Sequence, residues 1–460
     1  MCDQPHEAGT QSEPVEADPE LVEALAAGKL TAAEVAERLV ELPQLRRPHV
    51  GFVGYGGVRP GERVLLALDS HYESEVGAAL AAALRRRGAH VDLLSVDAGP
   101  DREFEALDEM AVVIRDRPFT EAPRRWEGLP WVEQFAGIGH YDLLIHGKGG
   151  PIAPTGFGYE QAPWLRAEHL EQGAAVYPRV LHRLINERTW ARIWIDGRGG
   201  RVHLTDPEGT DLTYTLHESY YDGTRRGFSE APLGSYGHLH GHPPQPILPE
   251  EDASGVIAGT TSHFSSPFPH MRLELDSGRL QSVEGGGEYG AEWQRLHGAT
   301  KDNQYPCFPG PGLFWLWEVA IGTNPWIRRP SRVQLLSSGG FEWERRRAGI
   351  IHIGIGTRWR GPEEVWAGEH GLLYGHLHVH LLFPTFEIET VDGRRVRVID
   401  EGRLCALDDP EVVDLATRIG DPDLLLRERW IPEVPGITAA GRYQEYARDP
   451  ARFIYERVGG

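Results

Sequence analysis

The pattern of hydrophobic and polar positions changes near residue 199 of the chain. Before that point, a near-continuous apolar run at 63–68 precedes an alanine-rich amphipathic segment at 73–87 and a second apolar segment at 90–96. Continuous apolar runs are typical of strands buried on both faces, as in a parallel sheet, whereas the segment between them has the period of a helix. We therefore expect a strand–helix–strand unit with a right-handed crossover, and a further strand at 141–146.

After residue 199, short alternating runs are separated by turns rich in glycine and proline, which is typical of antiparallel strands. The runs 201–204 and 210–216 flank the turn D-P-E-G, and the runs 386–390 and 394–399 flank V-D-G. These patterns predict an α/β fold: a Rossmann-like N-terminal domain with a parallel sheet, and a β-rich α+β C-terminal domain. No G-x-G-x-x-G motif follows the first predicted strand, so no dinucleotide site is expected.

The domain boundaries follow from the same changes of pattern, and a chain of 460 residues is long enough for two or three domains. Residues 1–20 are polar, acidic and expected to be disordered. Residues 21–198 form the expected α/β domain, which closes with a helix at 176–187 and a short strand at 192–196. The β-rich metal-binding domain is expected over 199–407, followed by a helical C-terminal tail over 408–460.

Composition excludes several classes of protein. The formal charge of −21 disfavours a nucleic-acid partner. Three cysteines form neither a disulfide framework nor a thiolate zinc site, and they fit a reducing compartment. The acidic N-terminus does not resemble a signal peptide, and no apolar run reaches the length of a membrane span. We expect a cytoplasmic protein with no membrane partner and a small-molecule substrate.

A cluster of histidines is the strongest chemical signal in the sequence. His376, His378 and His380 alternate with Leu377 and Val379, so a strand would place the three imidazoles on one face. A further histidine, His352, lies in the apolar run G-I-I-H-I-G-I-G. Imidazoles on one strand face can meet at a transition metal, and we favour this hypothesis over a face of solvated histidines.

Two other features are compatible with a metal but do not require one. Glu318 is the only carboxylate in L-F-W-L-W-E-V-A-I-G and needs a partner if it is buried. That partner is either a metal or one of three arginines nearby, Arg328, Arg329 and Arg332. The histidines at 238, 240 and 242 lie in a segment rich in glycine and proline, for which a surface loop is slightly favoured over a second metal or substrate loop.

Seven motifs occur in an order that resembles a known superfamily. They are G-E-R-V-L-L-A-L-D-S-H-Y, D-P-E-G-T-D-L-T, A-S-G-V-I-A-G, D-S-G-R-L-Q-S-V-E-G-G, E-V-A-I-G-T-N-P, I-I-H-I-G-I-G and the H-x-H run before P-T-F-E-I-E. Their order resembles that of the aminopeptidase T-type metalloaminopeptidases and the iron-dependent 2,5-dihydroxypyridine dioxygenases. The resemblance extends from about residue 61 to 402, and S-H-Y and G-G-x-E look closer to the dioxygenases.

The resemblance implies an α/β N-terminal domain, a β-rich C-terminal domain, a metal between them and a homodimer. Glu318 matches the metal-binding glutamate of L-G-E-x-A-L-G, and His352 matches the metal-binding histidine of H-I-A-L-G. The H-x-D pair of the aminopeptidases matches His378 and His380, so the aspartate has become a histidine. A shift of register would instead use His376 and His378.

Two departures distinguish this chain from the aminopeptidases. Pro244 and Gln245 stand where their glutamate precedes F-x-A-P, and Trp359 replaces a tyrosine. A bridging ligand and a polar catalytic group are thereby lost. Glu318, His378 and His380 remain, which is the two-histidine, one-carboxylate ligand set of non-haem Fe(II) oxygenases.

We therefore expect a mononuclear metal enzyme with Fe(II) that acts oxidatively, by ring cleavage or related oxygenation, on a small aromatic or heterocyclic substrate. His352 is expected to be either a fourth ligand or a catalytic acid/base. In the alternative, the site holds Zn²⁺, Mn²⁺ or Co²⁺ and hydrolyses amides or peptides, with Glu369 or His352 as catalytic base. A third hypothesis is a non-catalytic metal-binding protein.

Overall fold

The structure is a computed structural model of the chain. It describes fifteen segments, the ranges 19–27, 29–42, 54–69, 72–96, 113–115, 139–147, 158–162, 164, 166–222, 238–242, 246–261, 267–327, 346–357, 362–428 and 440–448. Several sequence predictions fall outside them, including those on residues 1–18, on most of G-K-G-G-P and on Trp359. Pro19 and Glu20, which were expected to be disordered, already belong to helix α1 (Pro19–Ala26).

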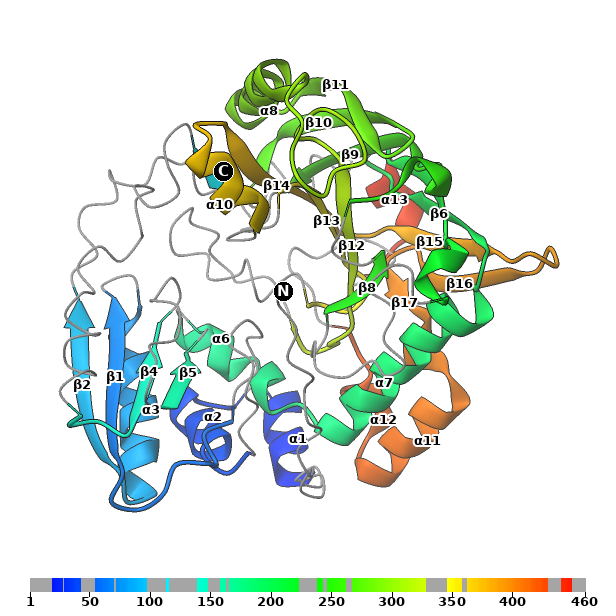
Figure 1. Ribbon diagram of the computed structural model, residues 1–460. Helices are drawn as coiled ribbons and strands as arrows, with labels where there is room; N and C mark the ends of the chain where they lie inside the picture. Colours follow the sequence, from blue (N-terminus) through cyan, green and yellow to red (C-terminus); the bar gives the residue numbers. More distant parts are fainter. Residues whose placement is uncertain are drawn as a thin grey trace.

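The N-terminal part contains a parallel sheet, drawn in blue to teal in Figure 1. Its strands are β1 (Arg63–Asp69), β2 (His90–Val96), β4 (Leu143–His146) and β5 (Gly158–Gln161), in the order β2-β1-β4-β5. Every pairing among them is parallel. This confirms the predicted strand–helix–strand unit, whereas the Rossmann-like domain stays a prediction.

Local sequence explains the helices that cover this sheet. Helix α3 (Ser74–Arg86) joins β1 to β2 and buries Val76, Leu80 and Leu84, which are spaced four residues apart and so share one helix face. The chain after it turns at Gly88, whose φ of 95° favours glycine. Helix α2 (Ala32–Leu39) begins with the predicted capping box, in which the Thr31 amide donates to Glu34 Oε2 at 2.8 Å.

The second part of the chain is built on an antiparallel sheet of eight strands. The order is β11-β10-β9-β7-β6-β15-β16-β17, and both predicted hairpins are confirmed, as β6 with β7 and β15 with β16. In chain order its strands are β6 (Arg201–Thr205), β7 (Asp211–Thr215), β9 (Ser254–Thr261), β10 (Pro267–Asp276), β11 (Arg279–Gly285), β15 (Thr385–Glu389), β16 (Arg395–Asp400) and β17 (Arg403–Leu404).

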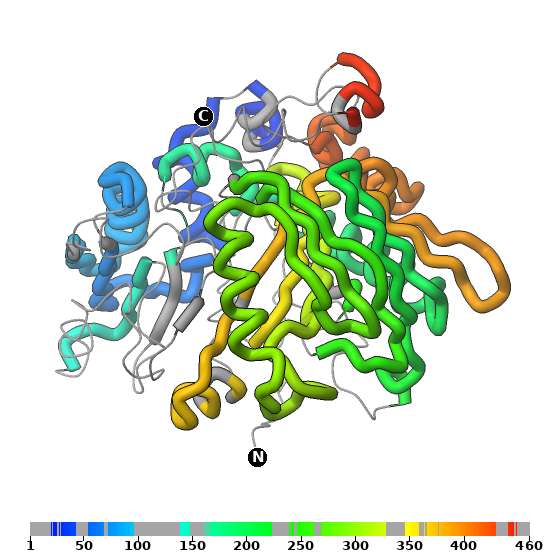
Figure 2. Tube along the Cα trace, turned by 90° about the horizontal axis from the view of Figure 1, so that it is seen from above, coloured from blue at the N-terminus to red at the C-terminus, as the bar shows by residue number. Residues whose placement is uncertain are grey.

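A third sheet has five antiparallel strands in the order β3-β14-β13-β12-β8. These strands are β3 (Val113–Arg115), β8 (His238–His242), β12 (Leu316–Gly322), β13 (Ile351–Gly356) and β14 (Tyr374–Leu381). Figure 2 shows the green strands of the large sheet lying over this sheet. The two sheets approach closely, because a Cβ added to Gly259 of β9 would lie 2.7 Å from Val379 Cγ1 of β14.

Two elements of the five-stranded sheet differ from expectation. The histidine segment 238–242 is strand β8, not a surface loop. Strand β3 comes from the segment between β2 and β4, and it pairs with the start of β14, where Arg115 lies opposite Tyr374. Part of the chain expected in the α/β domain therefore completes a sheet whose other strands lie after residue 199.

Helices connect and cover the three sheets (Figure 1). The expected strand at 192–196 is wrong: Arg192–Asp196 is a π-helical continuation of α7 (Arg179–Ala191), labelled η4. Its apolar residues do not alternate as a strand requires, because Ile193 and Trp194 are both buried. The other helices that matter below are η3 (Ala174–Val176), η5 (Glu218–Tyr220), η6 (Pro249–Glu251), α8 (Gly287–Thr300), α10 (Pro362–Glu369), η7 (Cys405–Asp408), α11 (Pro410–Ile419), α12 (Pro422–Leu425) and α13 (Tyr443–Ala447).

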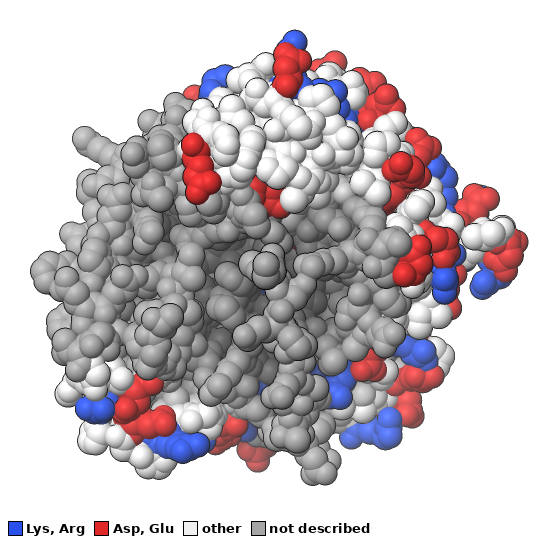
Figure 3. Space-filling model, in the orientation of Figure 1, with Lys and Arg blue, Asp and Glu red and all other residues white. Residues whose placement is uncertain are grey.

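The described surface shows acidic and basic side chains side by side. In Figure 3 they are interspersed around the rim of the molecule rather than segregated into a basic stripe. Among the helices within the described ranges, none has the length and apolarity needed to cross a bilayer.

Candidate metal centre

Three neighbouring strands of the five-stranded sheet carry the candidate ligands. Strand β12 carries Glu318, β13 carries His352, and β14 carries His378 and His380. Residues directly opposite each other in antiparallel strands point to the same side of a sheet. Because His380 lies opposite His352, and His378 and Glu318 both lie opposite Gly354, these side chains share one face.

Both faces of β14 are buried. Val379 points to the eight-stranded sheet, where it approaches Gly259, and Leu377 lies two residues before it on the same face; each is at most 1% exposed. On the opposite face, His378 and His380 are fully buried as well. The alternative of a solvated histidine face is therefore wrong for these two residues, and His376 lies outside the described side chains.

Glu318, His352 and His378 converge. One ligand atom from each lies within 4.8 Å of the other two, and all three residues are buried. His352 Nε2 is 3.8 Å from Glu318 Oε1, and the ring centroids of His352 and His378 are 4.1 Å apart. Ligands about 2.1 Å from one metal ion are roughly 3–4 Å from each other, so a small adjustment brings these donors onto a single ion.

A β-bulge in β12 lies directly before Glu318. The pairing of β12 with β13 shifts register between Leu316 and Glu318, because Leu316 lies opposite Ile355 and Glu318 lies opposite Gly354. Trp317 is the extra residue. Regular alternation would put Leu316 on the same face as Glu318 and the histidines. The bulge instead turns Leu316 to the face of Ile355, and Glu318 stays on the face of the histidines.

Gly354 leaves the space in which the donors meet. A Cβ at this position would lie 3.2 Å from His378 Nε2 and 3.3 Å from Glu318 Cβ. Distances this short require the neighbours to move by a few tenths of an ångström. A glycine between the two ligands therefore keeps the space between them free of a side chain. The donor set and this space together fit a transition metal.

His380 lies beside this group rather than within it. Its Nε2 is 2.7 Å from His352 Nδ1, which is the ring nitrogen that does not face Glu318. The expected set of Glu318, His378 and His380 is thus not the set that converges in the structure, since His352 takes the place of His380. Glu369, the expected alternative base, is exposed at the end of α10.

A tyrosine that the sequence did not indicate holds the ligand strand. The hydroxyl of Tyr289, on α8, donates to the carbonyl oxygen of His378 at 2.9 Å and accepts from its amide at 3.2 Å. Burial raises the pKa of Tyr289, so the hydroxyl keeps its proton and remains a donor. The residues are 89 positions apart, and no local motif links them.

Strand β8 carries a second buried polar group. The Tyr220 hydroxyl lies 2.7 Å from His242 Nε2 and donates to Glu251 Oε1 at 2.8 Å. His242 lies opposite Val319, so it belongs to the sheet face turned away from Glu318. The group therefore joins β8 to η5 and η6, and it does not extend the site of Glu318.

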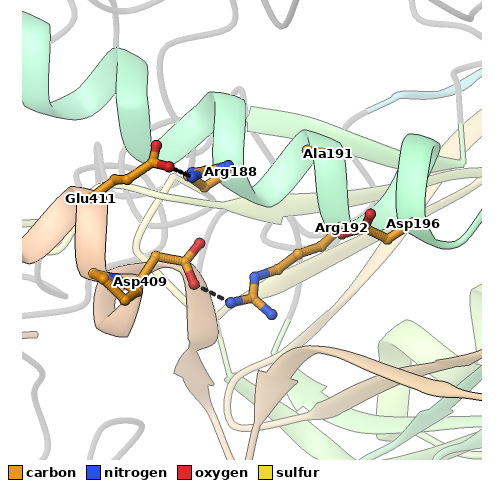
Figure 4. A pocket seen from close by; sticks show the side chains of 7 residues that line it. Arg188, Ala191, Arg192, Asp196, Asp409 and Glu411 are labelled. Carbon is orange, nitrogen blue, oxygen red and sulfur yellow. Dashed lines mark hydrogen bonds and ion pairs between the residues drawn. The ribbon is translucent and has the colours of Figure 1, made fainter.

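A cavity of about 290 Å³ lies elsewhere, at the junction of α7, η4 and α11 (Figure 4). Four of its charged lining residues form two ion pairs, Arg192 with Asp409 and Arg188 with Glu411, and Asp196 lines the cavity as well. These ion pairs tie α11 to α7, and the cavity contains no histidine among its lining residues.

The fold and the site together define a mixed α/β protein with a buried His/Glu group whose geometry could hold a metal ion. No profile of a known protein family and no curated protein matches the sequence. The solved structures that are remotely similar to the chain include two enzymes of the kinds that the motifs resemble. One is 2,5-dihydroxypyridine dioxygenase from Pseudomonas putida KT2440, with 14% identity and a TM-score of 0.42 over 81% of this chain and 96% of that one. The other is wild-type AmpT from Thermus thermophilus, with 14% identity and a TM-score of 0.42 over 81% of this chain and 98% of that one.

Proposed function

We propose that this protein is a mononuclear metal enzyme in which Glu318, His352 and His378 hold Fe(II), and that it acts oxidatively on a small aromatic or heterocyclic substrate. The observation that carries the proposal is the convergence of two imidazoles and one carboxylate within 4.8 Å in a buried part of one sheet. Two histidines and one carboxylate with open positions are the ligand set of non-haem Fe(II) oxygenases. The proposal differs from the sequence expectation in one ligand, His352 in place of His380.

When bound, iron supplies open coordination positions and redox chemistry for oxygen atoms of the substrate and for dioxygen. The chain supplies a rigid and dry setting. Three paired strands fix the ligands, and Tyr289 holds β14 at His378 from behind. Apolar neighbours such as Ile353 and Val379 are almost fully buried and exclude water from the opposite face of the sheet.

The experiment begins with protein purified without added metal and under exclusion of air. Elemental analysis should give about one iron ion per chain, and E318A and H378A should each lose it. Turnover of a panel of hydroxylated aromatic and heterocyclic rings should then require dioxygen and stop when the iron is oxidised. As a matched control, H203Q replaces an exposed histidine of the large sheet that contacts Asp211, and it should retain the metal.

The second candidate is a metal-dependent hydrolase of the aminopeptidase T type with Zn²⁺, Mn²⁺ or Co²⁺. It is favoured by the match of Glu318 and His352 to two metal-binding positions of that family. Two such ions per chain, with cleavage of peptides in the absence of dioxygen, would establish this candidate and refute the oxygenase. Absence of any metal from the wild-type protein would refute both candidates. The homodimer and the cytoplasmic location stay predictions.

A further inference from the structure

The two ring nitrogens of His352 face different neighbours. Nε2 lies 3.8 Å from Glu318 Oε1, on the side where the three candidate ligands converge. Nδ1 lies 2.7 Å from His380 Nε2, a distance short enough for a hydrogen bond between two imidazoles. The two rings are tilted by 60° and fully buried.

We propose that His380 is a positioning residue, which accepts a hydrogen bond from Nδ1–H of His352 and thereby directs Nε2 of His352 toward the metal. This inference rests on the proposed function, since it concerns the same metal. It adds the role of a residue that the sequence suggested as a ligand.

The position of the protons follows from the chemistry of imidazole. A neutral imidazole that binds a metal through one nitrogen carries its proton on the other nitrogen. If His352 binds through Nε2, its Nδ1 carries the proton and donates to His380 Nε2. That nitrogen of His380 must then present its lone pair to His352, and it is not available to the metal. His380 carries its own proton on Nδ1, and both rings are neutral.

The register of the sheet explains why His378 and His380 take different roles. His380 lies directly opposite His352, and opposite pairs in antiparallel strands bring their Cβ atoms to about 5 Å, so the two rings meet. His378 lies opposite Gly354, which has no side chain and leaves open the space between His378 and Glu318. One row of the sheet therefore carries His378 and Glu318 on either side of the glycine, and the neighbouring row carries His352 supported by His380.

Supporting hydrogen bonds of this kind are a common feature of metal sites. The free ring nitrogen of a ligating histidine usually donates to a carboxylate, a carbonyl or a water, and loss of that acceptor lowers metal affinity about 10- to 100-fold. Here the acceptor is a neutral imidazole. We expect it to fix the ring and the tautomer of His352 without adding a negative charge to the site.

The test uses the full-length protein, Co²⁺ as the probe and three variants of His380 and His378. H380Q keeps a hydrogen-bond acceptor, H380A removes it, and H378A removes a ligand. Co²⁺ affinity is measured by optical titration, and the ring N–H protons of ligating histidines are counted by their paramagnetically shifted, exchangeable proton resonances. Wild-type protein should show two such resonances, one from His352 and one from His378.

The expected results separate the three variants. H380A should bind Co²⁺ about 10- to 100-fold more weakly. Its His352 N–H resonance should shift and exchange faster with water, because the proton has lost its acceptor. H380Q should restore both the affinity and the slow exchange, which a role in packing alone does not explain. H378A should lose one resonance and most of the affinity.

Two results would overturn the inference while leaving the proposed function in place. A third shifted resonance in the wild-type protein that disappears in H380Q would make His380 a ligand. A wild-type Co²⁺ affinity and an unchanged His352 resonance in H380A would show that the contact has no influence on the site. If wild-type protein binds no Co²⁺ and retains no iron, the proposed function fails together with the inference.

Discussion

Two clusters of polar side chains differ in how their charges are matched. At the junction of α7 and α11, each arginine faces a carboxylate, and the cluster is partly open, with the side chains of Arg192 and Asp409 exposed by 26% and 17%. In the five-stranded sheet, one carboxylate and two imidazoles converge, and all three residues are buried. A cluster that pairs its own charges stabilises the fold, whereas a buried set of lone-pair donors is suited to bind a cation from outside.

The largest expected effect is the loss of the metal when a donor is removed. E318A and H378A should each lower metal affinity by more than about 100-fold, because three protein ligands are the minimum of this site type. Metal content after gel filtration measures the effect. D409A, which removes a carboxylate from the other cluster, should keep the metal, and equal loss in all three variants would erase the distinction between the clusters.

A smaller effect is expected from filling the space between the donors. G354A places a Cβ 3.2 Å from His378 Nε2, so the ligands must separate slightly. Overpacking of this kind costs about 1–3 kcal/mol, and we expect both the unfolding free energy and the metal affinity to fall. The matched control is G298A in helix α8, where a Cβ meets nothing within 4 Å. That substitution should raise stability by roughly 0.5–1 kcal/mol.

A third prediction concerns a buried carboxylate outside both clusters. Burial raises the pKa of Asp206 to about 7, against backbone hydrogen bonds from Glu208 and Phe383 that lower it. The folded protein therefore holds a proton that the unfolded chain releases near pH 4, and stability falls as pH rises from about 4 to about 7. D206N removes this titration.

The difference in unfolding free energy between D206N and the wild-type protein should therefore move in favour of the variant from pH 5 to pH 8. Urea denaturation at the two pH values measures this difference. The contributions of other titrating groups to the unfolding free energy cancel when D206N is compared with the wild-type protein at the same pH. A difference that is constant with pH would show that Asp206 is ionised in the folded protein throughout this range.

The smallest effects are expected from the ion pairs of α7 and α11. A double-mutant cycle on Arg192 and Asp409 should give a coupling of about 1 kcal/mol, and one on the more exposed pair Arg188 and Glu411 about 0.3 kcal/mol. Chemical denaturation measures both couplings, and metal content should be unchanged in every variant. A coupling of several kcal/mol would mean that the cluster is as strongly desolvated as the metal centre.

The sequence predicted those elements whose formation depends on residues close together in the chain. The capping box at Thr31, the hairpins around D-P-E-G and V-D-G, and the alternation of His378 and His380 all depend on neighbours within a few residues. The choice of ligands depends instead on which strands lie side by side. The pairing of His352 with His380, and of Gly354 with both Glu318 and His378, joins segments far apart in the sequence.

Two errors in the expected elements have different origins. The segment 238–242 looked like a loop because glycine and proline surround it, yet pairing with β12 makes it a strand. The segment R-I-W-I-D at 192–196 looked like a strand, but it follows α7 without a break and continues as a helix that buries Ile193 and Trp194. Pairing with a distant strand overrides the local preference in the first segment, whereas continuation of the preceding helix does so in the second.

Strand β3 has a consequence for the synthesis of the protein. It leaves the ribosome roughly 260 residues before Tyr374 and Gly375, the residues of β14 with which it pairs. At about 5–20 residues per second, this interval lasts some tens of seconds. During that time the edge that β3 will occupy does not exist, and the strand that carries His378 is still to be made. Newly made chains are therefore expected to become competent to bind metal only after translation has passed β14, however early the parallel sheet has folded.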